Sequence, residues 1–331
     1  IMSKKGSEFF SKGSIVFEKM CGKKVYFCPI CGKGFFIYDP NLLTLEDVPP
    51  NSKRKNQICL TCKDCNNTLG SKLDYNFSSF KRLEDFCKAL MEKSKFRTSN
   101  SEKIFFCFGE TKVRVRFDKD KDGKVKPIKR CNNEEDLKKY KQFFLDWKEG
   151  RGDKKFTISI ERKFSEKLRR LSILKSAFLA CFSLFGYSFS FHKDLEVVRK
   201  HILNPDSEVI KYWIKEENPS SEEENMIIEV ETPLNFFLVK IGKSYVALPK
   251  PGCTKNLYEE LNRSGNKITN FIGIGKGWPS TLSMLKDEER IIKEMENVNK
   301  TERMRRIAIA VSKWVKNSKW AQENNVKLEE I

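Results

Sequence analysis

The chain has 331 residues, which is enough for two or three domains with a sizeable core. Its 64 lysines and arginines outnumber its 45 aspartates and glutamates, so the formal net charge is +19. A charge of this size favours a polyanionic partner, and we expect nucleic acid; the alternative is a lysine-rich composition that reflects an AT-rich genome. No run of about 18 apolar residues occurs, so no membrane-spanning helix is predicted.

The first element in chain order is a basic segment, residues 3–24, which we expect to form a short strand or arm. The start of the chain lacks the apolar stretch of a secretory signal. Apart from four cysteines described next, the cysteines follow no regular spacing that would indicate a disulfide framework. We therefore expect a cytoplasmic protein.

Two Cys-x2-Cys motifs follow, Cys28-Pro-Ile-Cys31 and Cys62-Lys-Asp-Cys65. Two thiolates on a tight turn can share a tetrahedral Zn²⁺, and a second such turn completes a closed structural site. This spacing predicts one bound zinc, against the alternative of buried or adventitious cysteines. Cys21 and Cys59 lie near the two motifs and are alternative ligands.

Between the two motifs, residues from Leu43 to Val48 alternate between apolar and polar side chains, which is typical of a strand. Two prolines follow and end the predicted strand. A basic loop follows, with Lys53, Arg54 and Lys55. A second strand over 58–61 leads into Cys62, and a helix is expected to open at Asn66 and to run through Leu73 to Phe80. The predicted order is strand, loop, strand, helix.

This pattern resembles the HNH (His-Me finger) nuclease module, a ββα-metal core that is often braced by four zinc-binding cysteines. The resemblance covers about 55 residues near the N-terminus. It implies that Glu46 and Asp74 are ligands of a catalytic metal ion and that Asn66 orients the general base. It also implies phosphate contacts by the basic loop. At the position of the family's general-base histidine this chain has Asp47, and its two histidines, His192 and His201, are far away in the sequence.

The aspartate changes the expected chemistry, because its reference pKa of ~3.9 makes it a weaker base than imidazole at ~6.5. Glu46, Asp47 and Asp74 could instead form an oxygen-only Mg²⁺ or Mn²⁺ site that acidifies a bound water. Three interpretations stay open: an active nuclease that uses Asp47 or metal-bound hydroxide, a degenerate module that only binds nucleic acid, and a natural histidine replaced in this chain.

In the middle of the chain we predict a helix over 78–95, a strand over 104–117 and a helix over 134–147. One set of alternate residues in the strand is basic: Lys112, Arg114 and Arg116. The strand's basic face is either solvated or in contact with phosphates. The Gly-rich, charged residues 149–153 are the best domain boundary.

Beyond that boundary we expect a strand over 155–160, an apolar core helix over 165–187 that ends at Gly186, and a helix over 194–202. An antiparallel sheet is predicted from strands over 226–230, 236–241 and 244–249. The glycine-rich residues 273–277 are expected to form a turn. A long helix over 282–322 is basic on one side, and its Arg305 and Arg306 are candidate nucleic-acid contacts.

The predicted fold class is therefore α+β. We expect an HNH-like module with an N-terminal arm over 1–95, a β-hairpin and helical connector over 96–153, and a mixed targeting or sensing domain over 154–331. The expected function is metal-dependent cleavage of nucleic acid, DNA before RNA, with a role in bacterial defence suggested by analogy alone. The alternative is a catalytically degenerate, zinc-containing nucleic-acid-binding protein.

Overall fold

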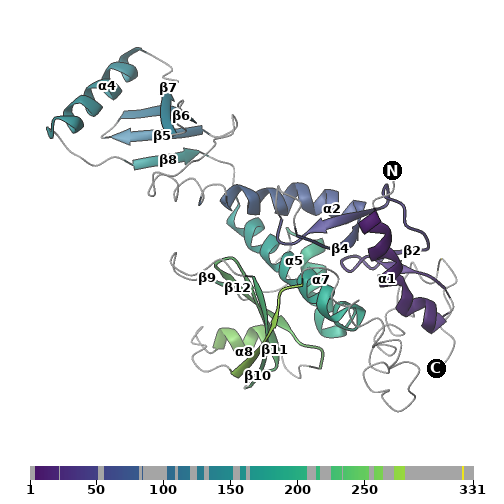
Figure 1. Cartoon of the computed structure of the whole chain (residues 1–331). Helices are drawn as coiled ribbons and strands as arrows, with labels where there is room; N and C mark the ends of the chain where they lie inside the picture. Colours follow the sequence, from purple (N-terminus) through teal and green to yellow (C-terminus); the bar gives the residue numbers. More distant parts are fainter. Residues whose placement is uncertain are drawn as a thin grey trace. The chain divides into compact units, whose positions relative to one another are not determined.

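The computed structural model of the chain has an α+β fold, with helices and strands mixed along the sequence (Figure 1). It describes residues 4–21, 23–50, 56–81, 84, 103–108, 111–119, 125–129, 134–151, 157–161, 165–206, 214–216, 225–232, 234–252, 257–263, 272–279 and 323. The chain divides into two compact units: Ile1–Ser78 together with Glu166–Ile331, and Ser79–Ser165. This division differs from the three consecutive ranges expected from the sequence, because a helix that begins at Glu166 packs against the cysteine-rich module.

The first unit begins with a helix, α1 (Lys4–Cys21), so the expectation of a strand or arm over 3–24 is wrong. The helix forms because Phe9, Phe10 and Phe17 recur at helical spacing and are buried in the core. Gly13 permits close packing, since a Cβ at this position would lie 2.5 Å from Cε2 of Tyr26.

The cysteine-rich module has the predicted order of strand, strand and helix. Its elements are β1 (Tyr26–Phe27), β2 (Gly34–Phe35), β3 (Leu43–Asp47), β4 (Gln57–Cys62), α2 (Lys63–Leu69) and a π-helical turn, η1 (Gly70–Asp74). Strands β3 and β4 pair antiparallel, with Leu43 opposite Cys62. The helix begins at Lys63 rather than at the expected Asn66, because the side chain of Cys62 caps it by accepting a hydrogen bond from Cys65 N.

The core helix of this unit is α5 (Glu166–Phe185), which packs against η1, β4 and the large sheet. It ends at Gly186, whose φ of 71° lies in the left-handed region, as the sequence predicts. Two shorter helices follow, α6 (Tyr187–Ser190) and α7 (Lys193–Leu203). The ring of Phe185 stacks on Phe237 with 4.5 Å between centroids, so α5 joins the cysteine-rich module and the sheet in one core.

The large sheet has five strands in the order β13-β10-β11-β12-β9, all in antiparallel pairs. Its elements are β9 (Ile214–Glu216), β10 (Met226–Thr232), β11 (Phe236–Ile241), β12 (Ser244–Pro249) and β13 (Ile272–Gly277), with α8 (Leu257–Arg263) between the last two. The three predicted strands are confirmed, and Gly242 lies in the turn between β11 and β12 with a φ of 56°. The glycine-rich residues 273–277 lie within β13, so the expected turn is wrong: their backbone pairs with β10.

The second unit contains a four-stranded antiparallel sheet in the order β7-β6-β5-β8, together with helix α4 (Figure 1). Its elements are β5 (Lys103–Phe108), β6 (Thr111–Lys119), β7 (Val125–Lys129), α4 (Glu134–Lys148) and β8 (Thr157–Glu161). The helix over 134–147 is confirmed. The single strand expected over 104–117 is instead a hairpin, with Phe108 opposite Thr111.

Several expectations fall outside the described residues. They concern the basic loop of Lys53, Arg54 and Lys55, most of the helix over 78–95, and the C-terminal helix with Arg305 and Arg306. Among the residues that the structure describes, no helix combines the length and the apolar character that crossing a membrane requires.

Candidate metal centre and acidic pair

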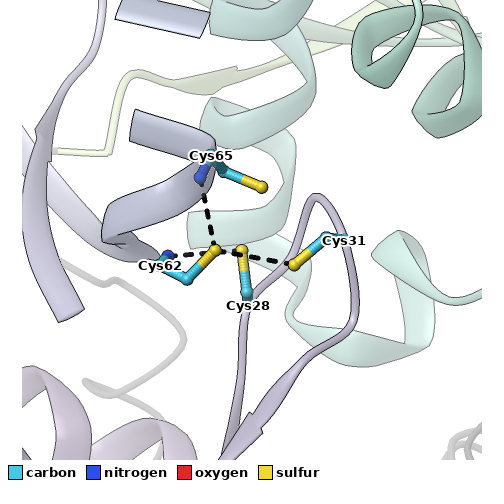
Figure 2. Close-up of side chains that lie close together, drawn as sticks. All are labelled: Cys28, Cys31, Cys62 and Cys65. Atoms are coloured by element: carbon cyan, nitrogen blue, oxygen red, sulfur yellow. Dashed lines mark hydrogen bonds between the residues drawn. The ribbon is translucent and has the colours of Figure 1, made fainter. Parts of the chain in front are cut away.

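Four cysteine sulfurs from the two Cys-x2-Cys motifs converge in the cysteine-rich module (Figure 2). The sulfurs of Cys28, Cys31, Cys62 and Cys65 all lie within 4.8 Å of one another. Cys28 and Cys31 come from the turn between β1 and β2, whereas Cys62 ends β4 and Cys65 lies in the first turn of α2. Cys59 is buried in β4 and does not belong to this group, so the pairing expected from the sequence is the one that forms.

The spacing of the sulfurs suits a tetrahedral metal ion. The Sγ atoms of Cys31 and Cys62 are 3.6 Å apart, close to the separation of about 3.8 Å that four Zn–S bonds of about 2.3 Å require. A disulfide would need about 2.05 Å. Three backbone N–H groups donate to the sulfurs, Cys62 N to Cys28, Cys65 N to Cys62 and Lys33 N to Cys31, at 3.4 to 3.5 Å. The donor set could hold a metal ion such as zinc.

Two buried tyrosines fix the first cysteine turn to the rest of the unit. The hydroxyl of Tyr187 accepts a hydrogen bond from Phe27 N at 3.1 Å and donates one to Phe27 O at 3.2 Å. The hydroxyl of Tyr26 donates to Leu60 O at 2.8 Å and accepts from Leu60 N at 3.3 Å. The backbone before Cys28 is therefore tied both to α6 and to β4.

The two predicted catalytic carboxylates meet at a buried lysine of α5. Lys175 Nζ lies 2.6 Å from Glu46 Oε1 and 2.9 Å from Asp74 Oδ2. The side chains of Lys175 and Glu46 are 1% and 2% exposed, and that of Asp74 is 18% exposed. Glu46 and Asp74 thus contact the same cation, which is an ammonium group, and their expected role as ligands of a catalytic metal ion stays a prediction. We refer to these three residues as the ion triple.

Hydroxyl groups satisfy the remaining carboxylate oxygens of the ion triple. Thr61 Oγ1 donates to Glu46 Oε2 at 2.8 Å, and Ser172 Oγ donates to Asp74 Oδ1 at 3.1 Å. Burial opposes the positive charge of Lys175, but the two carboxylates outweigh burial and raise its pKa above the ordinary value. Lys175 is therefore a positively charged group inside the core at neutral pH.

Asp47 lies in β3 and Asn66 lies in α2. Glu46 and Asp47 are consecutive in β3, and the register with β4 shifts between them. Asn66 Nδ2 donates to Thr44 Oγ1 at 2.7 Å, and the proposed orientation of Asp47 by Asn66 stays a prediction. Asn66 and Asp74 both border Gly70, because a Cβ there would lie 3.5 and 3.6 Å from their side-chain oxygens.

The expected oxygen-only metal site of Glu46, Asp47 and Asp74 does not form as a group. Within the described residues, the four cysteines are the only set of three or more Cys, His, Asp or Glu side chains close enough together to share a metal ion. His192 caps the N-terminus of α7, and His201 is buried in the same helix, so neither replaces the missing base in the cysteine-rich module.

Lys175 was missed as a site residue, although the sequence contains a signal for it. It occupies an apolar position of α5, flanked by Leu174 and Ser176, in a helix whose middle is otherwise almost free of charge. A lysine is almost never fully buried unless it is paired. Its position therefore indicates an acidic partner, but not which one.

Comparisons of the chain with protein-family models, with curated proteins and with solved structures found no match.

Proposed function

We propose that this protein binds nucleic acid and contains a zinc-stabilised ββα module that resembles HNH nucleases but does not cleave phosphodiester bonds. The observation that carries the second part is the ion triple, in which the ammonium of Lys175 contacts both Glu46 and Asp74. These are the two carboxylates that the resemblance assigns to a catalytic Mg²⁺ or Mn²⁺.

A divalent cation at this point would compete directly with the ammonium group. Both Lys175 and Glu46 are almost fully buried, so moving Lys175 aside would leave its charge in the core without its two partners. Mg²⁺ also gives up its water ligands reluctantly and favours sites that leave several of them in place. The burial of the ion triple therefore favours the lysine over the metal ion.

The residue at the base position supports the same proposal. An aspartate with an ordinary pKa of ~3.9 is a poor acceptor for a proton from water near neutral pH. A bound metal ion would acidify the water and so offset the weak basicity of an aspartate, but this proposal places no metal ion there. Hydrolysis needs a general base and a metal ion. Asp47 is a weak base, and Lys175 takes the position of the metal ion, so both positions support the proposal.

Binding of nucleic acid is proposed from the charge of the chain. A formal net charge of +19 attracts phosphate groups and predicts an affinity that falls steeply as salt is added. The zinc, held by Cys28, Cys31, Cys62 and Cys65, would keep the two cysteine turns and the start of α2 in place. Its role in this proposal is structural.

The second candidate function is phosphodiester hydrolysis by the same module. The observation that favours it is the meeting of Glu46 and Asp74, from β3 and η1, at one point of the core. In this case Mg²⁺ or Mn²⁺ would have to displace the ammonium of Lys175.

The test is to incubate the purified chain with plasmid DNA and with structured RNA, in Mg²⁺ or Mn²⁺, and to measure binding of the same nucleic acids at increasing salt. Asp47→His and Asp74→Asn are run beside it. We expect salt-sensitive binding and no cleavage by the present chain. Metal-dependent cleavage that disappears in Asp74→Asn would establish the second candidate, and absence of any binding at low salt would reject the first.

A further inference from the structure

Arg199 of α7 is a buried cation that its own helix does not compensate. Its side chain is 9% exposed, and its buried Nε atom makes no hydrogen bond within the described residues. An arginine is almost never buried to this degree unless an anionic group offsets its charge. The acidic residue of α7 that acts on it is Glu196, which is exposed and already pairs with Lys200 at 2.7 Å. A pair with an exposed carboxylate contributes little, so Glu196 does not account for the burial of Arg199.

Aromatic rings connect Arg199 to the first cysteine turn. The guanidinium group lies over the ring of Phe191, with Cζ 5.3 Å from the ring centroid. Phe191 packs edge-on against Phe27, and their centroids are 6.1 Å apart. Phe27 directly precedes Cys28 in the chain. Arg199 therefore belongs to the layer of side chains that supports this turn, although it lies far away in the sequence.

The cysteines of the first turn act on the charge of Arg199. Burial lowers the pKa of Arg199, whereas the negative charges of Glu196, Cys31 and Cys28 raise it. A guanidinium group stays protonated in proteins, so its charge is permanent. Two of the four candidate metal ligands thus lie within the range of electrostatic interaction with a buried cation.

The candidate metal centre needs such a cation. A Zn²⁺ ion bound by four thiolates forms a complex with a net negative charge, and three of the four cysteines are buried. Burying an anion is costly unless nearby groups compensate it. Backbone N–H groups supply part of that compensation. The ammonium group of Lys33 supplies little, because it is exposed and pairs with Asp64 at 3.4 Å.

We propose that Arg199 is a positioning residue of the four-cysteine metal centre, and that its buried guanidinium group compensates the charge of the metal-bound thiolates of Cys28 and Cys31. The buried cation and the buried anionic complex then stabilise each other. Groups that surround the ligands in this way commonly set the affinity of a metal site. This inference rests on the zinc site of the proposed function. It goes further by naming a residue outside the two Cys-x2-Cys motifs.

The first test measures the zinc affinity of the full chain by competition with a chromophoric chelator. We expect Arg199→Met to lower the affinity by about 10-fold or more. Arg199→Lys keeps the charge and should restore most of the affinity. The matched control is Lys193→Met, which removes one positive charge from an exposed position of the same helix and should hardly change the affinity. Arg199→Gln replaces Arg199→Met if the latter does not fold.

The second test reads the charge at the sulfurs directly, which a residue that only fills space would not alter. Co²⁺ is bound in place of zinc, and the thiolate-to-cobalt charge-transfer bands are recorded. A nearby cation stabilises the electrons of a thiolate, so its removal makes their transfer to the metal ion easier. The bands should therefore move to longer wavelength in Arg199→Met and stay in place in Arg199→Lys and Lys193→Met.

The outcomes separate this inference from the zinc site itself. If Arg199→Met and Lys193→Met have equal zinc affinities and equal spectra, Arg199 has no role at the metal centre, and the zinc site still stands. A lower affinity with unchanged bands, or an equal loss of affinity in Arg199→Lys, would overturn charge compensation. If the present chain binds neither zinc nor Co²⁺ through its cysteines, the zinc site of the proposed function fails and this inference fails with it.

Discussion

Lys175 Nζ lies 2.6 Å from Glu46 Oε1 in a part of the core where both side chains are almost fully buried. This contact joins the core helix α5 to strand β3 of the cysteine-rich module, and Asp74 completes it from the end of η1. A buried charge without a partner is strongly unfavourable, so the three groups depend on one another. The ion triple therefore holds together two stretches that are widely separated in the sequence.

Replacing Lys175 with methionine should destabilise the protein, because Glu46 and Asp74 would lose the ammonium group that compensates their charges in the core. Loss of one partner of a buried ion pair costs about 3 to 5 kcal/mol. The matched control is Lys167→Met at an exposed position of the same helix, for which a change within about 0.5 kcal/mol is expected. Denaturant unfolding measures both. If the two variants have the same free energy of unfolding, the ion triple does not stabilise the cysteine-rich module.

Metal binding at the four cysteines should follow the sulfur geometry. We expect one zinc per chain, with affinity reduced by more than about 100-fold in Cys31→Ser because one of four ligands is lost. Cys107→Ser should bind zinc like the present chain, because Cys107 lies in β5 of the other unit. Competition with a chromophoric zinc chelator measures the affinities. Normal zinc affinity in Cys31→Ser would reject the four-cysteine site.

Tyr187→Phe should weaken the attachment of the first cysteine turn to α6. The substitution removes a hydroxyl that exchanges two hydrogen bonds with the backbone of Phe27. Leaving these buried backbone groups without partners should lower the free energy of unfolding by about 1 to 3 kcal/mol. Tyr75 is exposed, and Tyr75→Phe is the control, with an effect within about 0.5 kcal/mol. A negligible effect of Tyr187→Phe in the same unfolding assay would contradict this role.

The stability of the fold should depend on pH through His201. Burial lowers the pKa of His201, and the positive charge of Lys167 acts in the same direction. A histidine with a pKa lower in the folded than in the unfolded chain stabilises the fold above its unfolded pKa of ~6.5, and this contribution is lost as the pH falls below that value. The free energy of unfolding should therefore fall more steeply between about pH 7.5 and about pH 5 than it does in His201→Gln. Parallel pH profiles of the two proteins, with zinc saturating, would disprove the assignment.

Local patterns predicted the cysteine-rich module because its geometry is encoded over short distances. The spacing of Cys28 with Cys31 and of Cys62 with Cys65 defines each turn, and alternation with prolines defines β3. The end of α5 was equally clear, since Gly186 adopts the left-handed conformation that glycine favours.

The features that local patterns did not predict depend on contacts with residues far away in the sequence. Lys175 lies within the core helix that the sequence predicts over 165–187, but nothing near it in the sequence indicates Glu46 or Asp74 as its partner. Residues 273–277 looked like a turn because glycines are common in turns, yet pairing with β10 makes them a strand. In α1 the basic composition hid the helical spacing of Phe9, Phe10 and Phe17.

The most direct test of the proposed role of Lys175 is to titrate the zinc-loaded chain with Mn²⁺ and to follow free Mn²⁺ by electron paramagnetic resonance. Because the ammonium already lies between Glu46 and Asp74, we expect no Mn²⁺ site in the present chain that is sensitive to substitution of either carboxylate. A stoichiometric Mn²⁺ site that disappears in Asp74→Asn would contradict this expectation. It would mean that a metal ion displaces Lys175 and that the module has the cation that hydrolysis requires.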